Sequence, residues 1–579
     1  MNPNVIQQTQ SIPANKINGW RQTITKIETF LGEKPFLGSF LLAVLLVVPI
    51  LVIFKFFYQL CDDTYALFLL KGIVLNGTPS EFNFEENAFL SLILKKLYLQ
   101  YPNIQWYSTL FVFTHFLSVW GMLAALNLGT HRFFKNVIFI IGSIVAIERL
   151  LIPLQWTTVA GVAAMGGTLL LAGIWRKEDS KFHLFGFFLS FILIMTSLLI
   201  RPSSLELIAL LSLPIGVYFF WKTKLTPSRR TILVFLAVTM VLSLAAVEYD
   251  HFYYSRNQSW NNSMEFFQQF RWLNSFRNLS YNENTKPFFD SIGWSANDLS
   301  LFKQNYFMDQ DTYSVEKLRR LTDYFPRFTL DKNSQGTFGM MFSNPFTGME
   351  LVFFFIALLF IPAESFGFIL FYVGWIFLVL LFCRLYLWIP ERIYIPCLFS
   401  LNNIAIFLSV SKFGSLVGNS SSPSRAFKWG AGFLTLFFIF SIFILHIDYA
   451  ENRYWSYQEL KLKAAMAEIN PQDDQVFVVW GSSFPYIKIG AFDNDEFLQR
   501  FHVISVDWFQ RTPTTSAMMD HFGLKNLFKD IVNNPKAFLI CEPNQWNLYQ
   551  VYMKEKFNVD VKLQFYFRSD QFAILSIHS

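Results

Sequence analysis

The run FLGSFLLAVLLVVPILVIFKFF at residues 36–57 is followed closely by the polar segment Cys61-Asp62-Asp63-Thr64-Tyr65. Only Lys55 is charged within the run, which is long enough to cross a bilayer core of roughly 30 Å at about 1.5 Å per helical residue. We therefore expect Asp62 and Asp63 at a membrane face, where ionising both carboxyl groups costs more than it does in water. The alternative is that the pair only caps a helix in a hydrated loop.

The composition of the whole chain is typical of a polytopic membrane protein. Its 579 residues are 53% hydrophobic and 19% aromatic, and only 15% are charged, whereas soluble domains are about 25% charged. The formal net charge of +6 is small for this length, so we expect membrane lipids and no nucleic acid among the partners. The four cysteines lie far apart and form neither a zinc-ligand spacing nor a disulfide framework.

Ten further apolar runs follow the first, so the sequence predicts about eleven transmembrane helices. The later runs lie at residues 106–126, 136–152, 157–175, 183–200, 204–221, 231–247, 347–362, 366–388, 393–411 and 430–447. Lysine and arginine gather in the N-terminal segment 1–35 and in the loops at 131–135, 176–181, 221–230 and 412–428. The positive-inside rule therefore predicts that these parts are cytoplasmic in a multi-pass protein of the plasma (inner) membrane.

The same alternation predicts that three larger polar blocks are extracytoplasmic, namely the outer loops 58–104 and 248–346 and the C-terminal region 448–579. The transmembrane domain thus covers residues 36–447. In the C-terminal region, short apolar runs at 476–480, 502–506 and 537–541 alternate with polar, helix-prone stretches, which predicts an α/β domain with a partly parallel sheet. Gly481-Ser482-Ser483 lacks the pattern of a nucleophile elbow or a phosphate loop, and we interpret it as structural.

These features resemble the GT-C class of polytopic glycosyltransferases, and in particular a set of bacterial membrane proteins related to that class. The similarity covers roughly the first 320 residues, and the order of its short motifs is its specific part. The motifs are Asp62-Asp63, Gly77-Thr78-Pro79-Ser80, Pro102-Asn103-Ile104-Gln105-Trp106-Tyr107, Gln155-Trp156-Thr157-Thr158, Ile200-Arg201 and Gly293-Trp294-Ser295-Ala296-Asn297-Asp298-Leu299.

The resemblance implies a GT-C-like fold and transfer of a sugar from a polyprenyl-phosphate carrier to a glycan, lipid or protein acceptor at the outer face. Asp62 or Asp63 would accept the proton of the attacking hydroxyl or orient the acceptor. No cofactor is certain. The class is not uniform in metal use, so binding of Mg²⁺ or Mn²⁺ by Asp62 and Asp63 stays open.

Arg201 and Arg392 are the candidates for holding the lipid phosphate, because the planar guanidinium suits phosphate oxygens. Arg392 lies in Glu391-Arg392-Ile393-Tyr394-Ile395-Pro396, which resembles an Arg-Tyr-x-x-Pro pattern of several GT-C branches with the tyrosine displaced by one position. The alternatives are a snorkelling helix end for Arg201 and an ion pair with Glu391 for Arg392.

Trp156 and Trp294 are candidates for stacking on sugar rings, and the alternative for both is the interfacial aromatic belt.

Two other functions compete with glycosyl transfer. A transporter or flippase of a lipid-linked or polar solute would place ionisable residues at mid-span and carry internal repeats, and a non-catalytic envelope scaffold would tolerate the loss of both aspartates.

Overall fold

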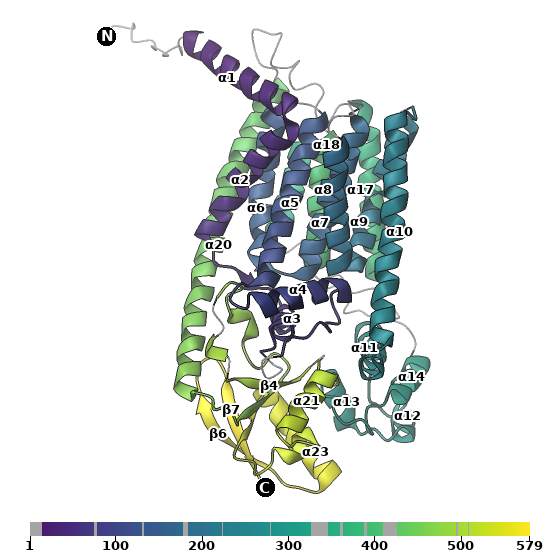
Figure 1. The fold of residues 1–579 in the computed structure, drawn as a ribbon, viewed down its shortest axis with the longest axis vertical. Helices are drawn as coiled ribbons and strands as arrows, with labels where there is room; N and C mark the ends of the chain where they lie inside the picture. Colours follow the sequence, from purple (N-terminus) through teal and green to yellow (C-terminus); the bar gives the residue numbers. More distant parts are fainter. Residues whose placement is uncertain are drawn as a thin grey trace, which may run out of the picture.

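A bundle of long helices forms one part of the molecule (Figure 1). The computed structural model describes residues 14–73, 78–129, 133–177, 183–222, 224–277, 279–325, 345–358, 363–386, 391–408, 425–493, 496–498, 500–507 and 509–579. The bundle helices are α2 (Pro35–Ile53), α5 (Trp106–Gly129), α6 (Phe133–Leu151), α7 (Trp156–Arg176), α8 (His183–Ile200), α9 (Pro202–Lys222), α10 (Pro227–Ser255), α16 (Pro345–Leu358), α17 (Ala363–Tyr386), α18 (Glu391–Leu408) and α20 (Arg425–Ile469).

The bundle is built from helices that suit a membrane. Six of the described helices are long and apolar enough to cross a bilayer, and four more are shorter apolar helices. Several expose large apolar side chains, among them Val52 at 78%, Met240 at 65% and Leu436 at 65%. Water would penalise such a surface, whereas lipid chains would not. The chain is therefore a helical protein whose apolar helices are those of a membrane protein.

Every apolar run expected from the sequence coincides with one of these helices, but some of the helices lie partly where none was expected. Helix α1 (Ala14–Glu33) occupies most of the polar N-terminal segment. Helix α20 continues to Ile469, far beyond the expected end at residue 447. Its last turns stay helical because Leu462, Ala465 and Met466 are buried, so one continuous helix links the bundle to the C-terminal region.

Some of the expected features lie outside the described residues. These are segment 1–13, residues 74–77 with Gly77 of the motif, and residues 130–132, 178–182 and 223 of three basic loops. Part of the block 248–346, at residues 326–344, and the loop residues 409–424 also lie outside them.

The polar parts of the chain gather at one end of the bundle (Figure 1). At this end lie α3 (Cys61–Lys71) and α4 (Ala88–Gln100). The same end holds the helices of the block 248–346, here called the insert, which are α11 (Gln258–Phe276), α12 (Lys286–Ser291), α13 (Ala296–Lys303) and α14 (Val315–Tyr324). The C-terminal sheet lies at the same end, and α1 lies at the opposite end. Three segments far apart in sequence therefore meet beside the aspartate pair.

The C-terminal region contains a five-stranded sheet with strand order β4-β3-β5-β7-β6. Strands β3 (Val476–Trp480), β4 (His502–Val506) and β5 (Ala537–Ile540) are parallel, whereas β6 (Lys562–Arg568) and β7 (Ala573–His578) form an antiparallel hairpin paired to β5. Helices α21 (Pro513–His521), α22 (Leu527–Asp530) and α23 (Pro543–Phe557) complete the region. The first three strands are the apolar runs that stand out in the sequence.

The sheet is buried on both faces because it lies between two hydrophobic cores. Phe477 and Val479 of β3 belong to the core that continues into the bundle. The alternate residues Val478 and Trp480 belong to a second core, shared with Phe270 of the insert. Successive strand residues point to opposite faces, so β3 is apolar throughout, as strands of covered parallel sheets are.

The loop after β3 fixes the sheet to the bundle. The backbone N–H of Ala491 donates to the carbonyl of Phe56 at 2.8 Å, and Gln105 donates to the carbonyl of Asp493 at 2.8 Å. Lys55, the one charged residue of the first apolar run, forms ion pairs with Glu459 at 2.5 Å and with Asp493 at 2.8 Å. These contacts place the sheet in a defined position relative to α3.

Replacing Lys55 by methionine is expected to destabilise this junction by about 1–2 kcal/mol. A carboxylate that loses its partner in a buried network is costly, but Lys463 also pairs with both acids and limits the loss. Thermal melting of the solubilised protein measures the effect. The matched control is Lys461→Met, which removes an exposed pair with Asp570 and should lower the melting temperature less, because exposed ion pairs contribute little to stability. Equal losses for the two variants would contradict this account of the junction.

Candidate functional site

The aspartate pair lies in the first turn of α3, which begins at Cys61 after the N-cap residue Leu60. Negative charge is favoured at this position because the first backbone N–H groups of a helix have no partners within it. Adjacent residues of a helix point about 100° apart. Asp62 and Asp63 therefore face different surroundings, although they are neighbours in sequence.

Asp63 is fully buried and holds two helices together. Its Oδ1 accepts a hydrogen bond from the backbone N–H of Trp156, the first residue of α7, at 3.1 Å. Its Oδ2 has no hydrogen-bond partner among the described residues. Burial raises the pKa of Asp63 well above the usual carboxyl range, against the bond from Trp156. Asp63 therefore favours its protonated form and a structural role.

Asp62 is only partly buried and faces a group of arginines. Burial raises the pKa of its carboxyl group, whereas the hydrogen bond from the Cys61 thiol and the charges of Arg392, Arg271 and Arg201 lower that pKa. The thiol lies 3.5 Å from Oδ1. Because burial raises the pKa of Cys61 as well, the thiol stays neutral. The structure thus brings Asp62 together with both arginines expected from the sequence.

Glu85, from the loop before α4, holds two of these arginines in place. Nη2 of Arg271 lies 3.1 Å from Oε1 and 3.3 Å from Oε2 of Glu85, and Arg201 pairs with the same carboxylate. The Arg201 guanidinium also lies 5.9 Å from the ring centroid of Trp156. Burial lowers the pKa of Arg201 to about 9, so it remains charged at neutral pH. Two cations from different parts of the chain are therefore fixed beside Asp62.

Arg392 lines a cavity of about 220 Å³ at the end of the bundle. The cavity lies between the ends of α6 and α18 and the middle of α20, and Arg149 and Asp448 line it too. Arg149 lies 3.6 Å from Asp448. The side chain of Glu391, the partner considered for Arg392 from the sequence, lies outside the described set. Glu451 lines the cavity as well, so its charged residues are two arginines and two acids. The planar guanidinium of Arg392 suits the phosphate of a lipid headgroup.

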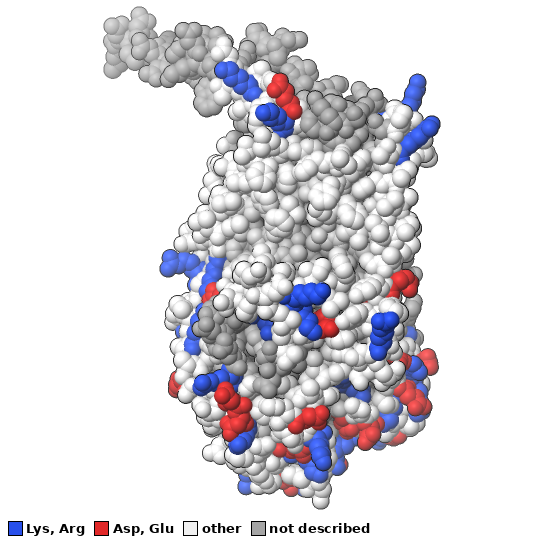
Figure 2. Space-filling view, in the orientation of Figure 1, with Lys and Arg blue, Asp and Glu red and all other residues white. Residues whose placement is uncertain are grey.

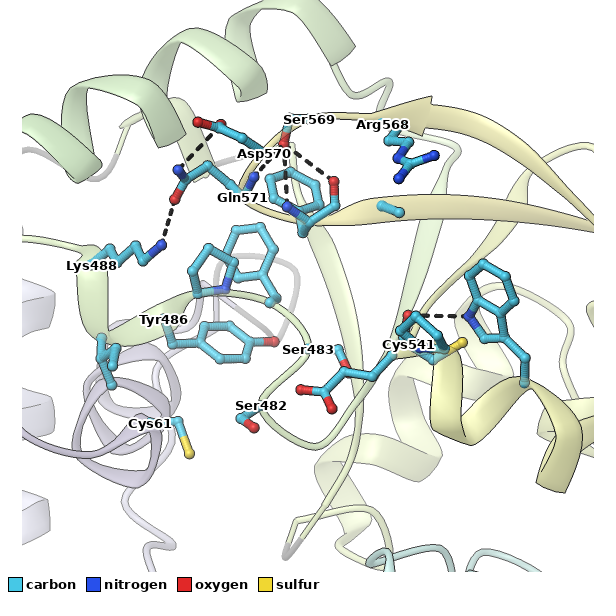
Figure 3. Close-up of a pocket in the computed structure, with 18 of the residues that line it drawn as sticks. Cys61, Ser482, Ser483, Tyr486, Lys488, Cys541, Arg568, Ser569, Asp570 and Gln571 are labelled. Atoms are coloured by element: carbon cyan, nitrogen blue, oxygen red, sulfur yellow. Dashed lines mark hydrogen bonds between the residues drawn. The ribbon is translucent and has the colours of Figure 1, made fainter.

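A second cavity, of about 670 Å³, lies on the side of the C-terminal sheet (Figure 3). Cys61, the residue before Asp62, lines it together with Tyr486 and residues that follow β3 and β5. Gln59 and Ile487 line both cavities. The two cavities therefore adjoin each other at the start of α3, one toward the bundle and the other toward the sheet.

Glu86 is a third acidic group buried close by. It accepts a hydrogen bond from Tyr107, and its Oε2 has no partner in the described part of the chain. Burial raises the pKa of Glu86 to about 7, although the bonds from Tyr107 and Asn83 lower it. The protonated form is therefore the form that this environment favours.

Stability should consequently depend on pH through Glu86. Between the unfolded pKa near 4.5 and the folded pKa near 7, the folded state binds more protons than the unfolded state, so stability falls as pH rises through this window. At about 1.4 kcal/mol per pH unit across this window, the loss is of the order of 3–4 kcal/mol. Glu86→Gln keeps an acceptor for Tyr107 and should flatten the thermal-melting profile between pH 5 and 8. A profile as steep as that of the wild type would contradict this assignment.

The carboxylates form a cluster different from the one that the sequence suggested for a metal. Ligand atoms of Cys61, Asp62 and Asp507 all lie within 4.8 Å of one another. Asp507 follows β4 and accepts a hydrogen bond from Asn305 at 3.0 Å. Carboxylate oxygens suit Mg²⁺ or Mn²⁺, whereas a neutral thiol does not. If a divalent cation binds here, Asp62 and Asp507 are the pair that would hold it, because Asp63 is engaged by Trp156.

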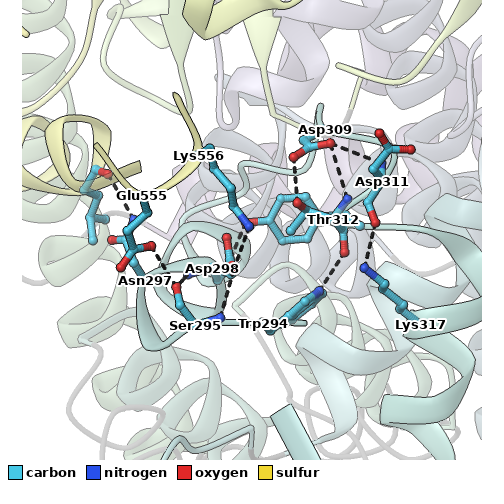
Figure 4. Close-up of polar contacts among 12 residues, drawn as sticks. Trp294, Ser295, Asn297, Asp298, Asp309, Asp311, Thr312, Lys317, Glu555 and Lys556 are labelled. Carbon is cyan, nitrogen blue, oxygen red and sulfur yellow. Dashed lines mark hydrogen bonds and ion pairs between the residues drawn. The ribbon is translucent and has the colours of Figure 1, made fainter. Parts of the chain in front are cut away.

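Trp156 and Trp294 occupy different places. Trp156 is buried within the cluster, with its backbone on Asp63 and its ring near Arg201. Trp294 is buried in the insert, where its ring N–H donates to the carbonyl of Thr312 at 2.6 Å (Figure 4). Phe302 and Tyr313 pack on its ring at 5.3 and 5.1 Å. The ring of Trp294 is therefore part of a core.

Sequence reasoning missed Glu85, Glu86, Arg271 and Asp507. Glu85-Glu86 is a second acidic doublet in the outer loop 58–104, so the sequence did contain a pattern that could have identified these two residues. Asp507 directly follows the run 502–506, and the carboxyl end of a parallel strand is a common place for ligand-binding residues. Arg271 carried no local signal, because only the packing of α11 brings it to Glu85.

A scan against protein-family models and a search of curated proteins both found no match to this chain.

Proposed function

We propose that this protein is a membrane glycosyltransferase of the GT-C type, which moves a sugar from a polyprenyl-phosphate carrier to an envelope acceptor. The observation that carries the proposal is Asp62, a partly exposed carboxylate with three arginines within electrostatic reach at the polar end of an apolar bundle. A base beside a group of cations is what transfer from a phosphate-linked donor requires.

In the proposed reaction, an acceptor hydroxyl attacks the anomeric carbon of the donor sugar. A new carbon–oxygen bond forms while the bond from the anomeric carbon to the phosphate oxygen breaks, and the bonding electrons leave with the lipid phosphate. Asp62 accepts the hydroxyl proton. Asp63 is not available for this step because it is engaged by the backbone of Trp156.

The donor would enter from the bundle side. Its phosphate fits the small cavity lined by Arg392 and Arg149, while its apolar chain remains among the lipid-facing helices. Arg392 also acts electrostatically on Asp62, so one guanidinium faces both the phosphate cavity and the base. Charge that develops on the leaving phosphate is stabilised there.

The proposal includes the membrane arrangement of about eleven spans in the plasma (inner) membrane, with a cytoplasmic N-terminus. Figure 2 shows a wide band free of lysine, arginine, aspartate and glutamate between two charged ends of the molecule. Basic residues predominate at the end with α1, which supports a cytoplasmic location for that end. The aspartate pair, the insert and the C-terminal α/β region then share the extracytoplasmic side.

A transporter or a scaffold is less well supported by the geometry. The ionisable cluster lies at the end of the bundle and not at its middle, which disfavours a mid-membrane transport site. Burying several carboxyl groups beside arginines costs free energy. A scaffold would not need such a group of residues.

The direct test is a gene deletion followed by mass spectrometry of lipid-linked sugars and surface glycans. The proposal expects a surface glycan that lacks one sugar type and a carrier-linked sugar that accumulates. A flippase would instead leave the carrier-linked sugar on the cytoplasmic face, which enzymatic probing of oriented vesicles distinguishes. Unchanged glycans and unchanged carrier-linked sugars would refute the proposal.

A further inference from the structure

The larger cavity lies where a parallel sheet has its natural ligand site. Strand β3 has β4 on one side and β5 on the other, so the chain leaves β3 in one direction and later crosses to its opposite side. The cavity is lined by residues 482–488, which follow β3, and by residues 541–543, which follow β5. A crevice outside the carboxyl ends of strands at such a switch point is the usual binding site of open α/β sheets.

The loops that form this cavity are held in a defined shape. Gly481 has a φ of +59°, a conformation that favours glycine, and its N–H donates to the carbonyl of Val506 at 2.9 Å. Ser483 donates to the side chain of Gln545 at 3.2 Å and thus links the loops after β3 and β5. The cavity is therefore preformed, and its 670 Å³ lies within the usual range for small-ligand sites.

Tyr486 supplies an unsatisfied polar group. The residue is 3% exposed, and its hydroxyl has no hydrogen-bond partner among the described atoms. Figure 3 shows this hydroxyl directed toward Ser482 and Ser483 of the cavity lining. Its electrostatic neighbours include Cys61 and Asp507. A buried hydroxyl without a hydrogen-bond partner lowers stability. A ligand that forms a hydrogen bond with Tyr486 would therefore gain affinity, at a place beside the cluster of Cys61, Asp62 and Asp507.

The rest of the lining combines aromatic rings with a balanced set of polar groups. Trp546 and Phe565 lie 5.7 Å apart on one wall. The charged residues are two cations, Lys488 and Arg568, and two acids, Glu542 and Asp570. Lys488 already donates to Gln571 at 2.6 Å, and Asp570 pairs with Lys461 at 2.5 Å. Rings together with polar groups of balanced charge suit a neutral polyol.

We infer that this cavity binds a neutral oligosaccharide and presents it to Asp62, so that the acceptor of the reaction is a glycan. The acceptor role depends on the proposed function, whereas binding of the oligosaccharide does not. The donor carries a long apolar chain and belongs on the bundle side, which leaves the cavity on the sheet side for the acceptor. The two substrates would then meet at the start of α3, where both cavities share Gln59 and Ile487.

The experiment measures binding of defined probes to the full-length protein in nanodiscs. The probes are oligosaccharides released by mild acid from the envelope of the gene-deletion strain and separated into neutral and anionic fractions. In saturation-transfer NMR, the neutral fraction should bind to the wild-type protein. Binding of the anionic fraction alone, or of neither fraction, would overturn the inference.

Variants locate the site. Tyr486→Phe removes one hydroxyl and should weaken binding about fivefold, as the loss of one hydrogen bond does. Trp546→Ala should weaken it by roughly tenfold or more, because it removes an aromatic wall. The matched control is Tyr566→Phe, which removes an exposed hydroxyl next to Phe565 on β6 and should leave binding unchanged. Binding that neither cavity variant weakens, at unchanged thermal melting, would overturn the inference.

Asp62→Asn separates this inference from the proposed function. The variant should bind the neutral oligosaccharides as the wild type does while losing transfer. If Asp62→Asn restores the surface glycan fully but the cavity still binds sugars, the proposed function fails and the binding site remains. If transfer depends on Asp62 but the cavity variants bind and transfer normally, the acceptor site lies elsewhere.

Discussion

Asp62→Asn should reduce sugar transfer by about a thousandfold, and Asp63→Asn should retain most of it. A general base contributes roughly 10²–10⁴-fold to a rate, and an amide cannot accept the proton. At position 63, an asparagine keeps an oxygen for the N–H of Trp156 and removes a carboxyl group whose charged form is disfavoured by burial. Transfer of radiolabelled sugar from carrier to acceptor in membranes, with each variant expressed in the deletion strain, measures both rates.

The pH profile provides a second readout for Asp62. Because burial raises its pKa, activity should fall with acidification at a pH above the usual carboxyl range near 4. Glu86→Gln controls for the other acid that titrates near this window and should leave the acid limb in place. If Asp63→Asn is inactive and Asp62→Asn is active, the roles assigned to the two aspartates are wrong.

Arg392→Gln should reduce transfer by about 10²–10³-fold, the effect typical of removing one group that stabilises transition-state charge. Arg392 lines the small cavity and interacts electrostatically with Asp62, so its loss affects both the leaving phosphate and the base. Arg392→Lys keeps the charge but not the planar fork and should recover only part of the rate. Transfer assays at saturating donor separate this effect from weaker donor binding.

The matched control for Arg392 is Arg149→Gln in the same cavity. Arg149 lies near Asp448. The arginines whose charges lower the pKa of Asp62 most are Arg392, Arg271 and Arg201, and Arg149 is not one of them. Its replacement should therefore raise the donor concentration needed and leave the maximal rate within about threefold. Equal losses of maximal rate for Arg149→Gln and Arg392→Gln would show that the cavity does not direct the phosphate toward Arg392.

Much of the architecture was readable from the sequence because bilayer crossing imposes a local rule. A run such as residues 36–57 must be long and apolar to cross lipid, and no distant contact alters that requirement. The same holds for β3, whose residues 476–480 are all apolar because both faces of the strand are covered. The end of α20 was missed because its last turns are held by buried contacts that no apolar run marks.

The candidate site was readable only in part. The sequence by itself determined that an acidic pair follows the first apolar run and that arginines end later helices. Tertiary structure alone decided which aspartate faces those arginines, since two helix neighbours point about 100° apart and only packing on α7 engages Asp63. It also decided that Arg271 and Asp507 join the cluster, because side chains more than 180 residues away in sequence are brought there by burial and ion pairing and not by any local pattern.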